Sequence, residues 1–159
     1  KTDEELSSIL KEILPVEVVD SAIILLIDYS KWISIYDIEY FSSLQHETIT
    51  EITLKETGDS ARGVVLTDED LVTEWLDFFA ALEIKRDLLP PIFGARIAGG
   101  NPTVIVTTEN ATYTFRFLSS DGFKIKIAGK TYLIKNPEII PFSQTYDEAA
   151  TRHGTISFW

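Results

Sequence analysis

The chain has 159 residues, of which 45% are hydrophobic and 25% are charged, a composition typical of a globular domain with its own core. It contains no cysteine, which excludes disulfides, thiolate metal sites and a cysteine nucleophile. The net charge is −11, whereas a protein that binds nucleic acid needs a cluster of basic residues on its surface. We therefore expect no nucleic acid as a partner. One domain is expected over residues 1–159, with a helical segment at 1–30 and an α+β body at 31–159.

The excess of acidic residues lies in the first part of the chain. Residues 1–60 hold 13 acidic and 4 basic side chains, a net charge of −9, whereas residues 61–159 hold 12 acidic and 10 basic side chains, a net charge of −2. Such a field suits a basic protein partner, or it serves only to keep the protein soluble. The chain begins at Lys1 without a methionine, so we expect it to start after a processing event or at an artificial boundary, with any signal or lipid-anchor sequence already lost.

The first 41 residues predict a helix followed by segments of ambiguous pattern. Thr2 and Glu5 have the spacing of a capping box, and the apolar stripe that follows them predicts a helix ending near Pro15. The next buried stretch, residues 16–29, has the β-branched residues of a strand and the length of a helix, and we favour a helix. Residues 32–41 alternate as a strand does, and the pattern of 17–41 as a whole leaves helix and strand open.

The centre of the chain predicts a hairpin and then the strongest helix of the sequence. Residues 48–55 alternate strictly, a turn follows at 57–59, and residues 62–66 can return as the paired strand. Thr67 has the position of an N-cap with acidic residues in the first turn after it. A wide apolar face at helical spacing then predicts an amphipathic helix over 67–82 that lies across a sheet.

The second half of the chain predicts an antiparallel meander with one buried, apolar face and one solvent-exposed, basic face. Phe115 and Phe117 point one way and Arg116 the other, while Lys124 and Lys126 alternate with apolar neighbours. Short turns with hairpin chemistry separate the strands. After a loop at 89–102, we expect four strands, at 103–108, 111–118, 122–127 and 130–135.

Together these elements predict an α+β fold. It consists of an antiparallel β-meander with one amphipathic helix (67–82) packed on one face, plus the N-terminal helical segment. The tail from residue 136 onward contains two prolines and is expected to be irregular. Its last residues, 156–159, end on two aromatic side chains and are expected to pack against the body or to close a strand.

The sequence contains no motif typical of catalysis or of metal binding. His46 and His153 have no second ligand at the spacing of a zinc site, so we expect both at the surface. The carboxylates at 68–70 are explained by the start of the helix, and the glycine-rich residues 99–102 lack the Lys-Ser/Thr of a phosphate-binding loop. We therefore predict no catalytic residue, no cofactor and no metal.

Two groups of residues are candidates for an interaction surface. The first is aromatic and contains Trp32, Tyr36 and Tyr40, residue types that are enriched at interfaces and that also build ordinary cores. The second is basic and is drawn from the second half, with Arg116, Lys124 and Lys126 as its members on the open face of the meander. Such a face can meet an acidic partner or the protein's own acidic first half, or it is the solvated side of a two-faced sheet. The basic residues considered for it are Lys85, Arg86, Arg96, Arg116, Lys124, Lys126, Lys130 and Lys135.

Residues 49–135 also carry a recognisable order of motifs. The strand Ile-Thr-Glu-Ile-Thr-Leu (49–54) is followed by a turn, by Thr-Asp-Glu-Asp (67–70) opening the helix, and by Phe-Lys-Ile-Lys-Ile-Ala-Gly-Lys-Thr-Tyr-Leu-Ile (123–134). This order resembles small extracytoplasmic α+β modules of Gram-positive (Firmicutes) lipoproteins and sensor proteins, a family of unknown function. The resemblance implies a secreted or membrane-anchored protein, tethered through a removed N-terminal segment, and a binding or sensing role without catalytic residues.

The leading hypothesis is a non-enzymatic extracytoplasmic binding or sensing module for an unknown protein or envelope ligand. The alternative is a cytoplasmic acidic inhibitor or immunity-type protein that binds a basic protein partner. Tight, salt-sensitive binding to a basic protein would favour the alternative. A hydrolase with an unrecognised site is a third interpretation.

Overall fold

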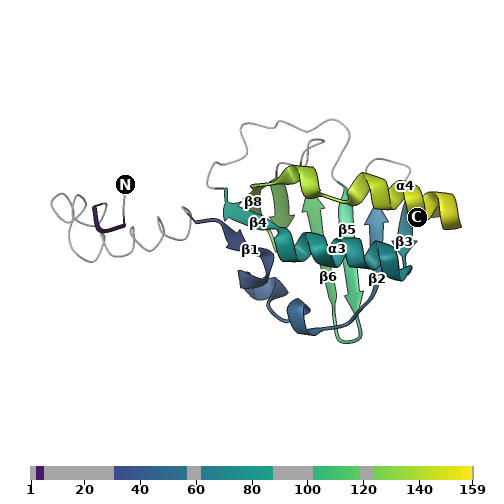
Figure 1. Ribbon diagram of the computed structural model, residues 1–159, viewed down its shortest axis with the longest axis horizontal. Helices are drawn as coiled ribbons and strands as arrows, with labels where there is room; N and C mark the ends of the chain where they lie inside the picture. Colours follow the sequence, from purple (N-terminus) through teal and green to yellow (C-terminus); the bar gives the residue numbers. More distant parts are fainter. Residues whose placement is uncertain (1–2, 6–30, 57–61, 88–101, 119–123, 159) are drawn as a thin grey trace.

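The computed structural model describes residues 3–5, 31–56, 62–87, 102–118 and 124–158 (Figure 1). The predictions for most of the N-terminal helical segment, for the turn at 57–59 and for the loop at 89–101 lie outside these residues. In the described part, the chain is α+β, with a nine-stranded antiparallel sheet and helices packed on it, which confirms the predicted fold class.

The sheet has the order β1-β4-β8-β7-β6-β5-β2-β3-β9, and every neighbouring pair in it is antiparallel. The predicted hairpin is present as β2 and β3, and the predicted meander as β5 to β8. The hairpin adjoins the meander because β2 pairs with β5. The strands are β1 (Ile33–Ser34), β2 (Ile49–Lys55), β3 (Arg62–Leu66), β4 (Glu83–Arg86), β5 (Thr103–Thr108), β6 (Thr112–Phe117), β7 (Lys124–Ile127), β8 (Lys130–Ile134) and β9 (Ile156–Ser157).

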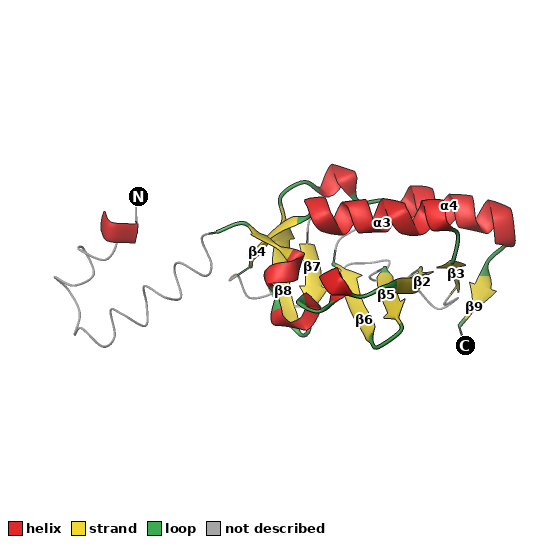
Figure 2. Cartoon of the chain, turned by 60° about the horizontal axis from the view of Figure 1, so that its bottom comes forward, coloured by secondary structure: helices red, strands yellow, loops and turns green. Residues whose placement is uncertain are grey.

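The core lies between the inner face of the sheet and two α-helices, which both lie on this face (Figure 2). Helix α3 (Glu69–Ala81) is the predicted amphipathic helix and buries Trp75 and Phe79 against Phe115 of β6. Its N-cap residue is Asp68 and not Thr67 as predicted. Asp68 makes no capping hydrogen bond, because its carboxylate contacts two side chains of the second helix.

That second helix, α4 (Phe142–His153), shows that the prediction of an irregular tail is wrong. It follows a 3-10 turn, η4 (Pro137–Ile139), and few of its residues are apolar, so its sequence carries a weak helical pattern. The end of the tail does close a strand, as predicted, because β9 pairs with β3. Phe158 then lies against Gly63, where an added Cβ would be 2.6 Å from the Phe158 ring and 2.4 Å from the carbonyl oxygen of Leu54.

The segment before β2 also differs from its prediction. Residues 32–41 form only the two-residue strand β1, followed by 3-10 turns. A capping box causes this change, since the Ser34 hydroxyl accepts from the backbone N–H of Tyr36 and the Asp37 carboxylate accepts from that of Ser34. The turns are η1 (Ile35–Asp37), η2 (Glu39–Phe41) and η3 (Leu44–His46). After α3 the chain forms strand β4 between β1 and β8, a strand that the sequence did not predict.

Candidate interaction surface

The two α-helices lie on one face of the sheet (Figure 2), and the strand register places Arg116, Lys124 and Lys126 on the opposite, outer face. Of the other predicted basic residues, Arg86 and Lys130 pair with the inward-facing Tyr132 and Ile127, and Arg96 lies outside the described residues. In β6 and β7 the residues that flank Arg116 and Lys126 are buried on the inner side, so these two side chains project outward. The strand register places Arg116 directly opposite Lys126 and also opposite Thr103, which in turn pairs with Lys55. A row of side chains that includes three cations therefore crosses four neighbouring strands, from β2 to β7.

A second row of outward side chains runs parallel to the first. Leu133 of β8 lies between Lys124 of β7 and Lys85 of β4. Lys135 follows β8 on the same side and pairs with Glu83. The outer face thus carries six cations, which we call the basic face: Lys55, Lys85, Arg116, Lys124, Lys126 and Lys135.

The carboxylates on the outer face only partly neutralise these cations. Among the described residues they are Glu51 of β2, Glu83 of β4 and Asp87 after β4, so six basic and three acidic residues of the described chain leave a net charge of +3 on this face. The Lys124 ammonium lies 2.9 Å from the Asp87 carboxylate, whose side chain is only 5% exposed. Arg116 and Lys126 form no ion pair with any described residue. Within the described part of the chain, no ion pair therefore compensates the positive charge of these two central side chains.

Trp32 joins the aromatic candidates to the basic ones. It lies just before β1 at the edge of the sheet and is 38% exposed. The ammonium groups of Lys85 and Lys135 lie 5.7 and 5.9 Å from its ring centroid, within the range of cation–π attraction. The structure thus brings Trp32 together with the basic face, although the sequence placed it in a different group.

Tyr36 and Tyr40 have a different environment, because both pack against the core. The Tyr40 ring contacts Phe41 and Tyr113 edge-on, and its hydroxyl accepts a hydrogen bond of 2.9 Å from the backbone N–H of Thr114. Burial raises the pKa of Tyr36 above its ordinary value. These contacts agree with the core interpretation of the aromatic group.

The helices carry the opposite charge to the basic face. We define the helix layer as Asp68, helix α3, the turn η4 and helix α4. This layer contains eight carboxylates and one arginine, which give a net charge of −7 when His153 is neutral. A groove of about 670 Å³ lies between the two helices. Its lining includes Asp70, Glu74 and Asp77 from α3 and Glu148 from α4. The sequence did not predict this groove, because one of its walls is the unpredicted helix α4.

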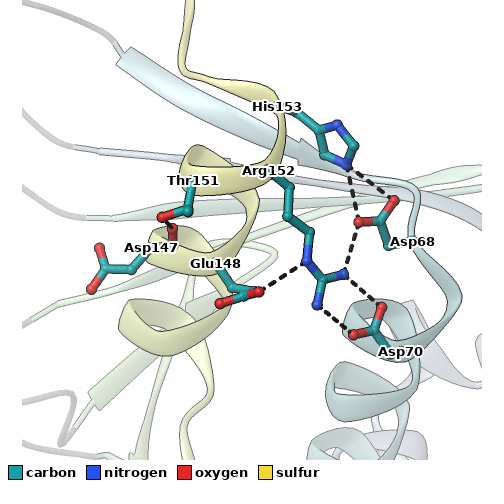
Figure 3. Close-up of polar contacts among 7 residues, drawn as sticks. All are labelled: Asp68, Asp70, Asp147, Glu148, Thr151, Arg152 and His153. Atoms are coloured by element: carbon teal, nitrogen blue, oxygen red, sulfur yellow. Dashed lines mark hydrogen bonds and ion pairs between the residues drawn. The ribbon is translucent and has the colours of Figure 1, made fainter.

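Arg152 closes one end of the groove (Figure 3). Its guanidinium donates to Asp68 at 2.9 Å, to Asp70 at 2.8 Å and to Glu148 at 3.0 Å. His153 Nε2 lies 3.0 Å from the Asp68 carboxylate. Hydrogen bonds from His153 and Arg152 lower the pKa of Asp68, and those from Arg152 lower the pKa of Asp70. The same carboxylates raise the pKa of Arg152.

This cluster has the geometry of a clamp between the start of α3 and the end of α4. The nearby Thr151 hydroxyl donates to the Asp147 carbonyl of its own helix (Figure 3) and makes no hydrogen bond to the His153–Asp68 pair. Within the described ranges, no group of three or more His, Asp or Glu side chains is arranged to hold a metal ion. The clamp's role in this geometry is therefore to fix the two helices relative to each other.

No helix in the described part of the chain is long and apolar enough to cross a membrane. Comparison of the chain with protein-family models, with curated proteins and with solved structures gave no significant match. A function for the chain must therefore be inferred from its own surfaces.

Proposed function

We propose that the protein is a non-enzymatic binding module whose basic face receives an acidic segment of a protein partner. One observation carries this proposal: a net charge of +3 is concentrated on one face of a chain whose total net charge is −11. Clustered charge of one sign guides a complementary partner to its docking site and fixes its orientation there.

The centre of the basic face supports the proposal most directly. Arg116 and Lys126 are cross-strand neighbours of like charge, an arrangement that destabilises an isolated sheet. A carboxylate placed between them would form ion pairs with both and remove their repulsion. Trp32 and the half-buried Leu133 lie beside the cations and offer apolar contact area, which a protein partner can use.

An address outside the cytoplasm is part of the proposal, and the resemblance of residues 49–135 to modules of lipoproteins and sensor proteins supports it. Fractionation of cells that produce the native full-length protein, with mass spectrometry of its mature N-terminus, tests this address. Recovery in the membrane or the medium, with Lys1 close behind a cleaved or lipidated residue, is the expected result. Recovery in the cytosol with an uncleaved start would contradict it.

Binding to an acidic probe tests the basic face itself. We expect the protein to bind immobilised poly-L-glutamate at about 0.1 M salt and to lose this binding near 1 M, where the Debye length falls to about 3 Å. The double variant Arg116→Glu/Lys126→Glu should bind at least roughly tenfold more weakly. The double variant Arg62→Glu/Lys130→Glu has the same change of charge at exposed positions off the basic face and should bind like the wild type. Equal loss of affinity in both variants would contradict the proposal.

The helix layer supports a second candidate function, an acidic inhibitor of a basic protein. Its net charge of −7 and the carboxylate-lined groove provide the surface for such a partner. Immobilised poly-L-lysine distinguishes the two functions in the same assay. The inhibitor is favoured if the protein binds poly-L-lysine and does not bind poly-L-glutamate. This binding should then be weakened by Glu74→Lys/Asp77→Lys and unaffected by Arg116→Glu/Lys126→Glu. Such a result would overturn the proposed binding module with a basic face.

A further inference from the structure

The two layers of the molecule present opposite charges on opposite sides of one sheet. The helix layer covers the inner face and carries a net charge of −7, while the outer face carries +3 (Figure 2). Two copies of the same surface repel each other because their charges have the same sign. The helix layer of one copy and the outer face of another attract each other because their charges are opposite. A second copy of the chain therefore offers the basic face a partner of complementary charge.

We propose that the helix layer of a second copy docks on the basic face, so that copies of the chain stack head to tail. This inference rests on the proposed function and names the acidic partner that the basic face receives. The second copy would cover the open face of the sheet with helices, giving the helix–sheet–helix layering in which sheets are commonly buried.

The carboxylates available for this contact form a stripe along α3. Asp77 forms no ion pair with any described residue, and Glu74 accepts only a 3.3 Å hydrogen bond from the Gln144 side chain in the described part. The two available carboxylates, Glu74 and Asp77, lie about 4.5 Å apart along the helix at 1.5 Å per residue, and Asp70, which Arg152 already binds, extends the stripe to about 10 Å. The cationic row from Lys55 to Lys126 crosses three strand spacings, or about 14 Å, so the stripe fits within the row.

The contact joins two different surfaces and so does not close on itself. Each added copy leaves one basic face and one helix layer free, which predicts growth of chains with protein concentration and not a fixed dimer. The net charge of −11 on each copy opposes stacking. At an ionic strength of about 0.15 M, screening over roughly 8 Å weakens this long-range repulsion more than it weakens pairs in contact. We therefore expect association that requires high protein concentration.

Sedimentation velocity of the whole chain over a range of concentrations tests the inference. At about 0.15 M salt the weight-average sedimentation coefficient should rise with concentration, and at about 1 M salt it should remain that of a monomer. Arg116→Glu/Lys126→Glu and Glu74→Lys/Asp77→Lys should each be monomeric when alone. An equimolar mixture of the two should associate, because each variant supplies the surface that the other lacks.

The mixture separates loss of the contact from loss of the fold, since a misfolded variant would not be rescued by its counterpart. Arg62→Glu/Lys130→Glu serves as the matched control and should associate like the wild type. A wild type that stays monomeric at every concentration, or a mixture that does not associate, would overturn the stacking. If poly-L-glutamate binding persists in that case, the proposed function stands and only the second copy is excluded as the partner; if it is also absent, both fail.

Discussion

Arg152 connects three carboxylates with one planar side chain. Its guanidinium binds Asp70 through two nitrogens and also reaches Asp68 and Glu148. Both helix dipoles favour this arrangement, because the aspartates lie at the start of α3 and Arg152 lies in the last turn of α4. A lysine has no rigid fork and cannot reproduce the bidentate contact.

Arg152→Ala is expected to lower the urea midpoint of unfolding at neutral pH. Hydrogen bonds from His153 and Arg152 hold the pKa of Asp68 below 3.8, and hydrogen bonds from Arg152 hold the pKa of Asp70 below the same value. The stabilisation that these two ionised carboxylates give to the folded state is therefore fully present above pH 3.8. It is lost as the pH falls through the lowered folded-state pKa values. Urea titrations at a series of pH values should therefore show the gap between wild type and variant narrowing below pH 3.8.

The exposed Arg62→Ala provides the control for that titration, since Arg62 lies outside the clamp. Arg62→Ala should change the urea midpoint only slightly. The difference in midpoint between the wild type and this variant should not decrease below pH 3.8. A gap between the wild type and Arg152→Ala that stayed constant down to the acid limit would mean that Arg152 stabilises the protein through packing and not through its carboxylate partners.

At the scale of the element, α4 is held in place by a side-chain hydrogen bond to α3 that cannot be predicted from the sequence of α4. The indole N–H of Trp75, which is fully buried on α3, donates to the Thr145 hydroxyl of α4 at 3.0 Å. That hydroxyl donates in turn to the carbonyl of Pro141, at the start of α4. Two buried polar groups are thereby satisfied, and the middle of α3 is linked to the first turn of α4.

Thr145→Val preserves the shape of this side chain and removes both hydrogen bonds. The Trp75 N–H would be left buried without a partner, which we expect to cost about 1–3 kcal/mol of unfolding free energy. The Pro141 carbonyl still accepts a hydrogen bond from the backbone N–H of Thr145. Urea denaturation followed by tryptophan fluorescence measures the loss. Thr151→Val is the matched control, because its exposed hydroxyl bonds only within its own helix, and its effect should stay within about 0.5 kcal/mol. Equal losses in the two variants would contradict the role of the interhelical bond.

At the scale of the whole molecule, the basic face retains a repulsive pair that the fold itself does not need. Arg116 and Lys126 oppose each other in register, and both are exposed. Like charges in this position weaken a sheet, whereas opposite charges strengthen it. The pair therefore does not add to stability, and it supports the acidic partner proposed above.

Lys126→Glu should consequently raise the unfolding free energy by about 0.2–1 kcal/mol, because it converts the repulsive pair into an ion pair across the strands. The same variant should bind poly-L-glutamate more weakly. Thermal and urea denaturation measure the first effect, and Lys130→Glu, which has the same change of charge at the β7–β8 turn, controls for net charge. A loss of stability specific to Lys126→Glu would contradict this account of the basic face.

The sequence by itself determined the elements whose pattern is local. The alternation of Phe115, Arg116 and Phe117 assigns these side chains to opposite faces of any sheet that β6 joins, and the apolar face of α3 requires that it pack against something. For the same reason, Arg116, Lys124 and Lys126 could be assigned to an open face without knowledge of the strand order. Helix α4 could not be predicted, because the Thr145 hydroxyl finds its partner 70 residues away. The end of β1 is set by a local capping box of Ser34 and Asp37, which the strand-like alternation of residues 32–41 outweighed in the prediction.

Only the tertiary structure decided which charges share a surface. The pairing of β4 with β8 brings Lys85 beside the meander, and that of β2 with β5 adds Lys55 to the row of Arg116 and Lys126. The docking of α4 beside α3 gathers the acidic side chains on the other side. From the sequence alone, these charges appear as a net −9 over residues 1–60, a net −2 over residues 61–159 and a basic open face limited to the meander. Side-chain alternation is a property of a few consecutive residues, whereas strand order and helix docking depend on contacts between distant segments, and these contacts separate the charge into two opposed faces.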